Sequence, residues 1–160
     1  MRYQIRQRLL TFTAHYDIAN EAGEPILEAV RESWFRPQIV IRSKNGVELA
    51  CLRQKLLTWR PRFDITREGL PLATVVRRMT LKPYFTVDLA EGGRLEVAGS
   101  FWEHNYQFTE GGRVIAEVSS KMWSLRDVYG VEVLEAEYDA IVLATVIAIA
   151  ALNAQSKQSS

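Results

Sequence analysis

Residues 140–152 read AIVLATVIAIAAL and are apolar on every side except at Thr145. A helix with that pattern belongs in a protein core or in a membrane. These thirteen residues would span about 20 Å as a helix, whereas a bilayer crossing needs roughly 20 residues. A buried strand is the alternative, but the alanines and the length favour a helix. The sequence therefore predicts a buried helix near 139–153, which the rest of the chain must surround.

The rest of the chain repeats one pattern six times. LLTFTAHYDI at 9–18 and LLTWRPRFDI at 56–65 share LLT and DI in the same register. Each copy opens on an aromatic residue or leucine, 21 to 24 residues after the previous one, and three copies place a proline two residues later. The opening residues are Phe12, Phe35, Trp59, Leu81, Trp102 and Leu125. A pattern that recurs at this spacing indicates one repeated supersecondary unit.

Each copy is typical of a β-hairpin. Four residues after the opening position comes a pair of apolar residues spaced by two, so that both side chains point to one face of a strand. Glycine turns such as AEGG at 90–93 separate the copies and supply the positive φ of tight turns. The six pairs are Tyr16/Ile18, Ile39/Ile41, Phe63/Ile65, Phe85/Val87, Tyr106/Phe108 and Tyr129/Val131.

Six hairpins make twelve antiparallel strands, and a twisted sheet of that size tends to close, which removes its exposed edges. A two-sheet sandwich is the alternative. The apolar helix favours a barrel, because about eight strands are filled by side chains and sixteen leave a channel. We therefore expect a mainly β fold: a closed twelve-stranded antiparallel β-barrel of six hairpins around a central hydrophobic C-terminal α-helix. It forms one domain over 1–153, followed by a disordered polar tail over 154–160.

Composition places the chain among ordinary globular domains. It has 160 residues and a formal net charge of +1, so no overall field draws it to nucleic acid or membrane. Cys51 is the only cysteine, which rules out an internal disulfide and favours a reducing compartment. The start, MRYQIRQRLL, has no long apolar run and does not read as a secretory signal. We expect a cytoplasmic protein.

Near-neutrality conceals a separation of charge. The connections around the six opening residues should lie at one end of the barrel, and the glycine turns at the other. Windows around the first set hold thirteen basic and three acidic residues, a net charge of +10. The remaining seven basic and sixteen acidic residues give the rest of the chain −9. The windows are 6–16, 29–38, 53–63, 76–85, 100–106 and 120–128.

Five of these cations form the candidate ligand-binding set: Arg36, Arg60, Arg62, Lys82 and Arg126. All but Arg62 directly follow an opening residue, and an aromatic side chain beside a cation suits a membrane interface. Such an end would meet anionic lipid or phosphoinositide head groups, with the protein peripheral to the membrane. The alternative is plain surface charge, which keeps strands soluble and complements the C-terminus of the helix.

Several longer motifs make the chain resemble a known family. They are YQIRQRLLTF at 3–12, LRQKLLTWRPRFDI at 52–65, GSFWEHNYQF at 99–108, KMWSLRDVYGVEV at 121–133 and the terminal apolar segment. Together they resemble the LURP-one-related proteins of the tubby C-terminal-like superfamily, which also includes the phospholipid scramblases. The resemblance covers about residues 3–153. It implies a closed twelve-strand barrel around a hydrophobic C-terminal helix, in agreement with the residue pattern.

The resemblance also bears on function. Tubby-like domains bind phosphoinositide head groups, scramblases act at bilayers, and plant LURP-one-related members are linked to pathogen defence. The lipid-binding residues of tubby match no positions here, so none is carried over. The scramblases' membrane-spanning tail and their Cys-rich and Pro-rich segments have no counterpart in this sequence, and we expect no scrambling.

Catalysis has little support in the sequence. His15 and His104 are the only histidines; EHN at 103–105 could form an acid–base cluster, but an exposed turn histidine is the favoured interpretation. Cys51 is expected in the wall or core. No spacing suggests zinc, no glycine-rich loop opens a helix, and no carboxylate pair of the hydrolase kind stands out. We expect a non-enzymatic binding module without cofactor or metal. A protein-interaction module stays open, while nucleic-acid binding is disfavoured by the acidic opposite end.

Overall fold

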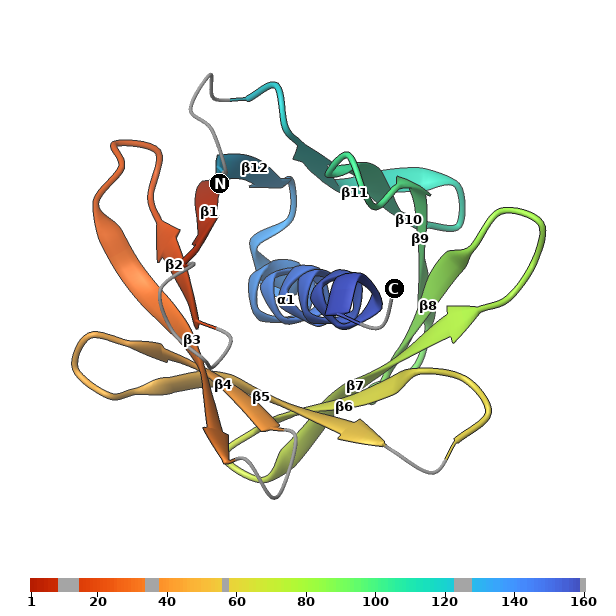
Figure 1. The fold of residues 1–160 in the computed structure, drawn as a ribbon, viewed down its shortest axis with the longest axis horizontal. Helices are drawn as coiled ribbons and strands as arrows, with labels where there is room; N and C mark the ends of the chain where they lie inside the picture. Colours follow the sequence, from red (N-terminus) through yellow and green to blue (C-terminus); the bar gives the residue numbers. More distant parts are fainter. Residues whose placement is uncertain (9–14, 34–37, 56–57, 123–127, 159–160) are drawn as a thin grey trace.

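Twelve strands form one closed antiparallel barrel around a C-terminal helix (Figure 1), which confirms the predicted fold. The structure, a computed structural model, describes residues 1–8, 15–33, 38–55, 58–122 and 128–158. Every strand pairs with its neighbours along the chain, and β1 closes the ring on β12. The strands are β1 (Arg2–Gln7), β2 (His15–Ala19), β3 (Pro25–Ser33), β4 (Gln38–Ser43), β5 (Glu48–Lys55), β6 (Arg62–Arg67), β7 (Leu70–Arg78), β8 (Tyr84–Leu89), β9 (Arg94–Ser100), β10 (Asn105–Glu110), β11 (Arg113–Ser119) and β12 (Val128–Val133). A short 3-10 helix, η1 (Ala136–Tyr138), leads into α1 (Asp139–Gln158).

The core lies between α1 and the inner face of the barrel. All six predicted pairs face the helix: each of their side chains is at most 5% exposed, and all belong to one apolar cluster with α1. Alternation of side chains along each strand puts them there. Thr145 is fully buried as well, and its hydroxyl donates to the Ile141 carbonyl at 2.7 Å. The one polar side chain of the apolar stretch is therefore satisfied within the helix.

The start of α1 is tied to the first strand. The Tyr3 hydroxyl donates to Asp139 Oδ2 at 2.8 Å, and the Met1 amino group donates to the Val133 carbonyl at 2.6 Å. Burial, together with the hydrogen bond and charge of Asp139, raises the pKa of Tyr3 above its ordinary value. These contacts fix where the helix enters the barrel.

The end of α1 differs from the prediction. The helix continues to Gln158 instead of ending near residue 153, so the expected disordered tail is wrong for residues 154–158. The polar side chains bond inside the barrel mouth: Asn153 Nδ2 donates to the Phe101 carbonyl at 3.1 Å, and Gln155 exchanges hydrogen bonds with Gln54 of β5. Because these partners come from distant parts of the chain, the sequence pattern alone did not reveal them.

The length argument against a membrane span also needs correction. Residues Ala136–Lys157 form a helical segment that is long and apolar enough to cross a membrane by length and composition alone. The burial of α1 inside the barrel, where residues 142–149 are at most 1% exposed, is typical of a core helix. Burial, and not length, is what speaks for a core role.

The up-and-down order places alternate connections at opposite ends of the barrel. Glycine marks one end: in the β6–β7 turn, Glu68 and Gly69 both have positive φ, 49° and 82°, as a two-residue type I′ hairpin requires. We call this the glycine end. The opposite end carries the β1–β2, β3–β4, β5–β6, β7–β8, β9–β10 and β11–β12 connections, and we call it the basic end. As expected, α1 begins at the glycine end and finishes at the basic end.

Candidate functional site

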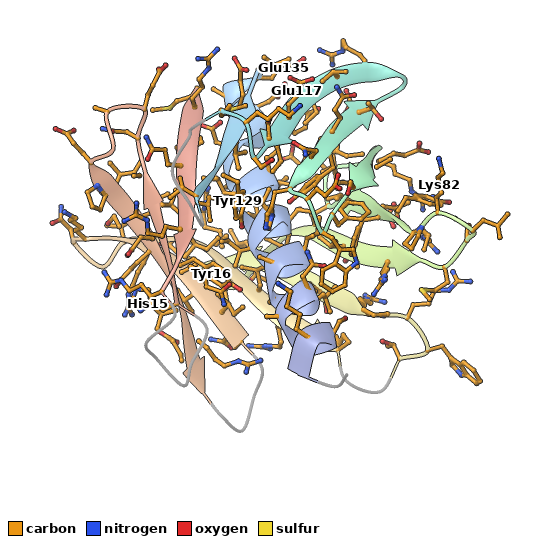
Figure 2. All side chains as sticks on the ribbon, turned by 45° about the horizontal axis from the view of Figure 1, so that its top comes forward. His15, Tyr16, Lys82, Glu117, Tyr129 and Glu135 are labelled. Atoms are coloured by element: carbon orange, nitrogen blue, oxygen red, sulfur yellow. The ribbon has the colours of Figure 1, made fainter. Side chains whose placement is uncertain are left out.

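The structure describes three of the five predicted ligand-binding cations, and these three lie at the basic end. Arg60 is exposed in the β5–β6 connection, Lys82 is exposed in the β7–β8 connection, and Arg62 is exposed at the start of β6. Figure 2 shows Lys82 at the periphery of the barrel. Arg36 and Arg126 lie outside the described residues.

Arg62 differs from the other two because it forms an ion pair with Asp64. Its Nε lies 3.2 Å from Asp64 Oδ1, and Lys55 Nζ approaches Asp64 Oδ2 at 3.5 Å. Residues two apart on one strand share a face, so this pairing could have been read from the sequence. Arg60 and Lys82 make no ion pair within the described part of the chain. Their charges are therefore the more available for a ligand.

The two connections that carry Arg60 and Lys82 are built alike. Residues 58–61 read TWRP and residues 80–83 read TLKP, and we call these segments the paired tips. In each, the threonine hydroxyl donates to the carbonyl of the cation at 2.6 Å. This brace holds Trp59 and Leu81 outward, at 103% and 104% exposure. Sequence reasoning missed the threonines, although their shared position in TxxP was the available signal.

Exposed apolar side chains alone do not distinguish the basic end. Trp59, Met79, Leu81 and Trp102 are exposed there, and Met1, Val47, Leu70 and Leu134 are exposed at the glycine end. The difference lies in composition. Only the basic-end set, among the described residues, contains tryptophan, and each paired tip joins its apolar side chain to a cation. Such a combination favours an anionic surface with an apolar layer beneath it.

Two further arginines face inward at the basic end. Arg77 follows Ala73 and Val75 on the inner face of β7, and Arg31 occupies the corresponding place on β3. The Nε atoms of both are buried and have no hydrogen-bond partner among the described residues. The charge count included these residues without predicting their direction. Burying a donor without an acceptor costs free energy. These two guanidinium groups therefore lack the acceptors that would offset their burial.

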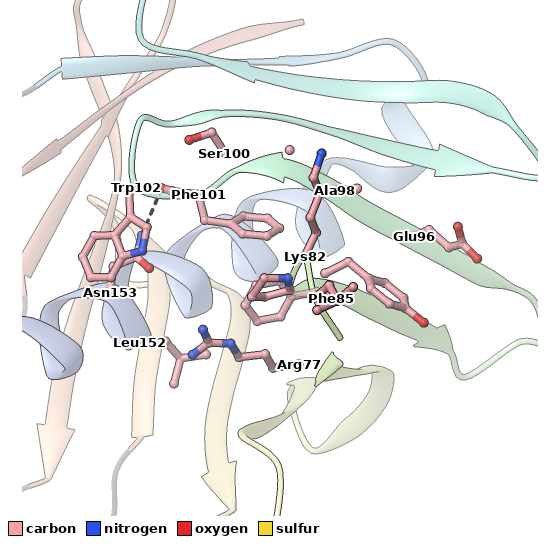
Figure 3. Close-up of a pocket in the computed structure, with 14 residues that line it drawn as sticks. Arg77, Lys82, Phe85, Glu96, Ala98, Ser100, Phe101, Trp102, Leu152 and Asn153 are labelled. Carbon is pink, nitrogen blue, oxygen red and sulfur yellow. Dashed lines mark hydrogen bonds between the residues drawn. The ribbon is translucent and has the colours of Figure 1, made fainter. Parts of the chain in front are cut away.

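A pocket of about 860 Å³ opens beside Arg77. It lies between the β7–β8 connection, the end of β9 and the last turns of α1 (Figure 3). Phe85, Phe101 and Leu152 supply apolar lining, and Lys82 contributes a cation. The sequence predicted a helix at the centre of the barrel and did not indicate a pocket. The helix does fill the barrel lumen, but the pocket lies between splayed strands at the rim.

The two histidines occupy different surroundings. His104, expected as an exposed turn residue, is half-buried and stacks on Tyr129 with ring centroids 4.0 Å apart. Burial lowers the pKa of His104, and the charge of Lys157 lowers it further. His15 Nε2 lies 3.4 Å from Glu28 and 3.7 Å from Asp17, on the outer face of β2. Within the described part of the chain, neither arrangement brings a histidine to a nucleophile.

Cys51 is buried in β5, as predicted for a residue of the wall or core. Its neighbours Ala50 and Leu52 face the core, so Cys51 lies on the outer side of the strand. Burial, with the charge of Glu48, raises the pKa of the thiol and keeps it protonated. A protonated thiol is a poor nucleophile. Across residues 1–8, 15–33, 38–55, 58–122 and 128–158, no cluster of His, Cys, Asp and Glu could hold a metal ion.

Comparisons with known proteins agree with the architecture. The model of a family described as LURP-one-related matches residues 1–150. The Bacillus subtilis (strain 168) protein YxjI, described as uncharacterized, is 31% identical over 106 residues, which cover 66% of this chain. The matched region spans 62% of YxjI, less than two thirds of its length. The X-ray structure of an Arabidopsis thaliana protein has the same fold, with a TM-score of 0.71 at 15% identity over 95% of this chain and 91% of that one.

Proposed function

This chain belongs to the LURP-one-related family, and from that premise we propose that it is a non-enzymatic binding module. In this proposal the basic end docks on anionic phospholipid head groups at a membrane surface. The cytoplasmic leaflet is the proposed site of action, because its lipids carry negative charge. A barrel filled by its own helix offers rims and loops for binding, and the family and fold support a binding module of this kind.

The observation that carries the proposal is the pair of tips. Trp59 and Leu81 stand fully exposed beside Arg60 and Lys82, on neighbouring hairpins with the same threonine brace. Folding gains nothing from leaving large apolar side chains in water. At a bilayer surface the cations would meet phosphates, and the apolar tips would reach the interface beneath them. Each cation near an anionic surface contributes about 1 kcal/mol, so Arg60 and Lys82 together would contribute about 2 kcal/mol.

The first test is sedimentation with phosphatidylserine-containing vesicles at low and high salt. Changing Trp59, Arg60, Leu81 and Lys82 together to serine should abolish sedimentation. Loss of the two charges alone should weaken binding about thirtyfold, because about 1.4 kcal/mol is a factor of ten. High salt should weaken binding of the unchanged protein, since it screens the charges.

A matched control removes the same kinds of group from the glycine end. Lys44, Val47, Leu70 and Arg94 are exposed there, and changing all four to serine should leave vesicle binding intact. Equal loss in both variants would contradict docking through the basic end. If the unchanged protein does not sediment with vesicles at low salt, the lipid proposal is wrong. A salt-sensitive gel shift would then identify nucleic acid as the ligand, and a copurifying protein would identify a protein partner.

A further inference from the structure

The pocket at the basic end lies where β9 continues beyond the point at which its pairing with β8 stops. Their pairing stops at Phe85↔Val97, whereas β9 continues alongside β10 as far as Ser100↔Asn105. Gly99 permits the close approach of β9 to β10: its φ is +143°, and an added Cβ would lie 2.5 Å from the Asn105 carbonyl oxygen. The resulting pocket, about 860 Å³, is within the usual range for sites that enclose a small molecule, roughly 300–1,000 Å³.

The floor of the pocket is apolar and reaches the barrel core. Phe85 and Phe101 meet edge to face with ring centroids 4.9 Å apart, and Leu152 of α1 lies beside them. Trp102, 57% exposed, and Leu81 extend the apolar surface outward to the rim. A polar solute alone would leave this apolar floor exposed to water, whereas an alkyl chain would cover it.

The cations of the pocket have no counter-ion in the described structure. Arg77 Nε is buried without a hydrogen-bond partner there, and neither Arg77 nor Lys82 joins a described ion pair. Figure 3 shows the Arg77 guanidinium beside Leu152 and Lys82 reaching across the pocket, with Glu96 on the far side. A planar guanidinium suits a carboxylate or phosphate. The carboxylate of Glu96 would repel an anion, so the head group belongs on the Arg77 side.

We propose that this pocket binds one single-chain anionic amphiphile. Arg77 holds its carboxylate or phosphate head group, Lys82 adds positive charge to the pocket, and the alkyl chain packs on Phe85, Phe101 and Leu152. The inference rests on the proposed function for the source of the ligand, because the pocket opens beside the Leu81 tip that would meet the bilayer. A free amphiphile in solution carries the same chemistry, and the two sources are separated by experiment.

The test is calorimetric titration with decyl phosphate below its micelle concentration. We expect saturable binding of one molecule per chain, with decyl maltoside and inorganic phosphate binding at least tenfold more weakly. Arg77→Gln should weaken decyl phosphate binding by about 10- to 100-fold, the usual worth of a hydrogen bond to a charged group. Lys82→Ser, at an exposed position, should weaken it in the same direction.

A steric variant locates the binding. Ala98 lines the pocket on β9, and Ala98→Trp should abolish binding. Gln107→Trp is the matched control, because Gln107 is the partner of Ala98 on β10 but does not line this pocket. Equal affinity in the Ala98 and Gln107 variants, or in unchanged protein and Arg77→Gln, would overturn the assignment. So would inorganic phosphate binding as strongly as decyl phosphate.

Membrane docking through the paired tips and amphiphile binding in the pocket can be disproved independently. Trp59 and Arg60 do not line the pocket, so Trp59→Ser with Arg60→Ser should weaken vesicle sedimentation and leave decyl phosphate binding unchanged. Vesicle binding without decyl phosphate binding would overturn the pocket and spare the proposed function. Decyl phosphate binding without vesicle binding would support the pocket and identify the free amphiphile as the source.

Discussion

Replacing Ile147 with aspartate is expected to prevent folding. Ile147 is fully buried in α1, in the middle of the barrel core. A carboxylate there would lose its water without gaining a partner, at a cost of several kcal/mol. Domains of this size are stable by only about 5–15 kcal/mol in total. Circular dichroism of the purified variant should show loss of the native spectrum.

A graded series keeps this prediction measurable if the aspartate variant yields no soluble protein. Ile147→Val should lower the free energy of unfolding by about 0.5–1.5 kcal/mol and Ile147→Ala by about 2–5 kcal/mol in urea titrations. Val47→Asp is the control, because Val47 is 63% exposed in the β4–β5 turn and should tolerate the same charge. An Ile147→Asp protein as stable as the unchanged one would contradict the central position of α1.

Stability should fall steeply above pH 10. Tyr16, Tyr106 and Tyr129 are buried beside α1, and the first and last of them are labelled in Figure 2. Burial raises the pKa of Tyr16 to about 12, against the charge of Arg31, and raises the pKa of Tyr106 and Tyr129 further. The Tyr16 and Tyr129 hydroxyls have no hydrogen-bond partner among the described residues. All three phenols are therefore strongly held in the neutral form.

The direction in which stability changes with pH follows from proton binding in the folded and unfolded chains. Above pH 10 a tyrosine in the unfolded chain loses its proton while the folded chain retains it, so unfolding becomes more favourable as pH rises. Below pH 10 these tyrosines are neutral in both the folded and the unfolded chain, so their contribution to the free energy of unfolding is fully present. Each such tyrosine lowers the free energy of unfolding by about 1.4 kcal/mol per pH unit, so these three together lower it by about 4 kcal/mol per pH unit. Tyr3, whose pKa is also raised, makes the slope steeper still. The contribution of Tyr16 should level off above pH 12, where its folded form also titrates.

Urea titrations at several pH values between 9 and 12 would measure this slope. Tyr16→Phe should reduce it by about 1.4 kcal/mol per pH unit. Phe63→Leu perturbs the same core without changing the number of tyrosines, so it should lower stability by a similar amount at every pH. A Tyr16→Phe slope equal to that of the unchanged protein would show that this phenol titrates freely in the folded state.

The architecture could be predicted because it depends on regular patterns. Pairs such as Phe63 and Ile65 occur on every second strand, with both side chains on one face. The all-apolar stretch of α1 must be buried by the rest of the chain. Both are properties of local sequence. The end of α1 was predicted wrongly because Gln155 is satisfied by Gln54, about a hundred positions away. No pattern near the C-terminus reveals that contact.

The candidate site was predicted only in outline. The repeat located Arg60 and Lys82, and the structure adds the threonine brace that presents the tips. The pocket was not foreseen, because it depends on where β8 and β9 cease to pair and on the close approach at Gly99. Strand separation of this kind is a tertiary property, since the same residues would also suit a fully paired ladder.

Docking through the paired tips is tested most directly by the fluorescence of Trp59. The other tryptophans, Trp34, Trp102 and Trp123, are replaced by phenylalanine, and the protein is mixed with vesicles of brominated phosphatidylserine. The account predicts a blue shift and quenching of Trp59 at low salt, both reversed by high salt, because the tip enters the interface. Emission unchanged from that in buffer, at a lipid concentration where the protein sediments with vesicles, would contradict docking through this end.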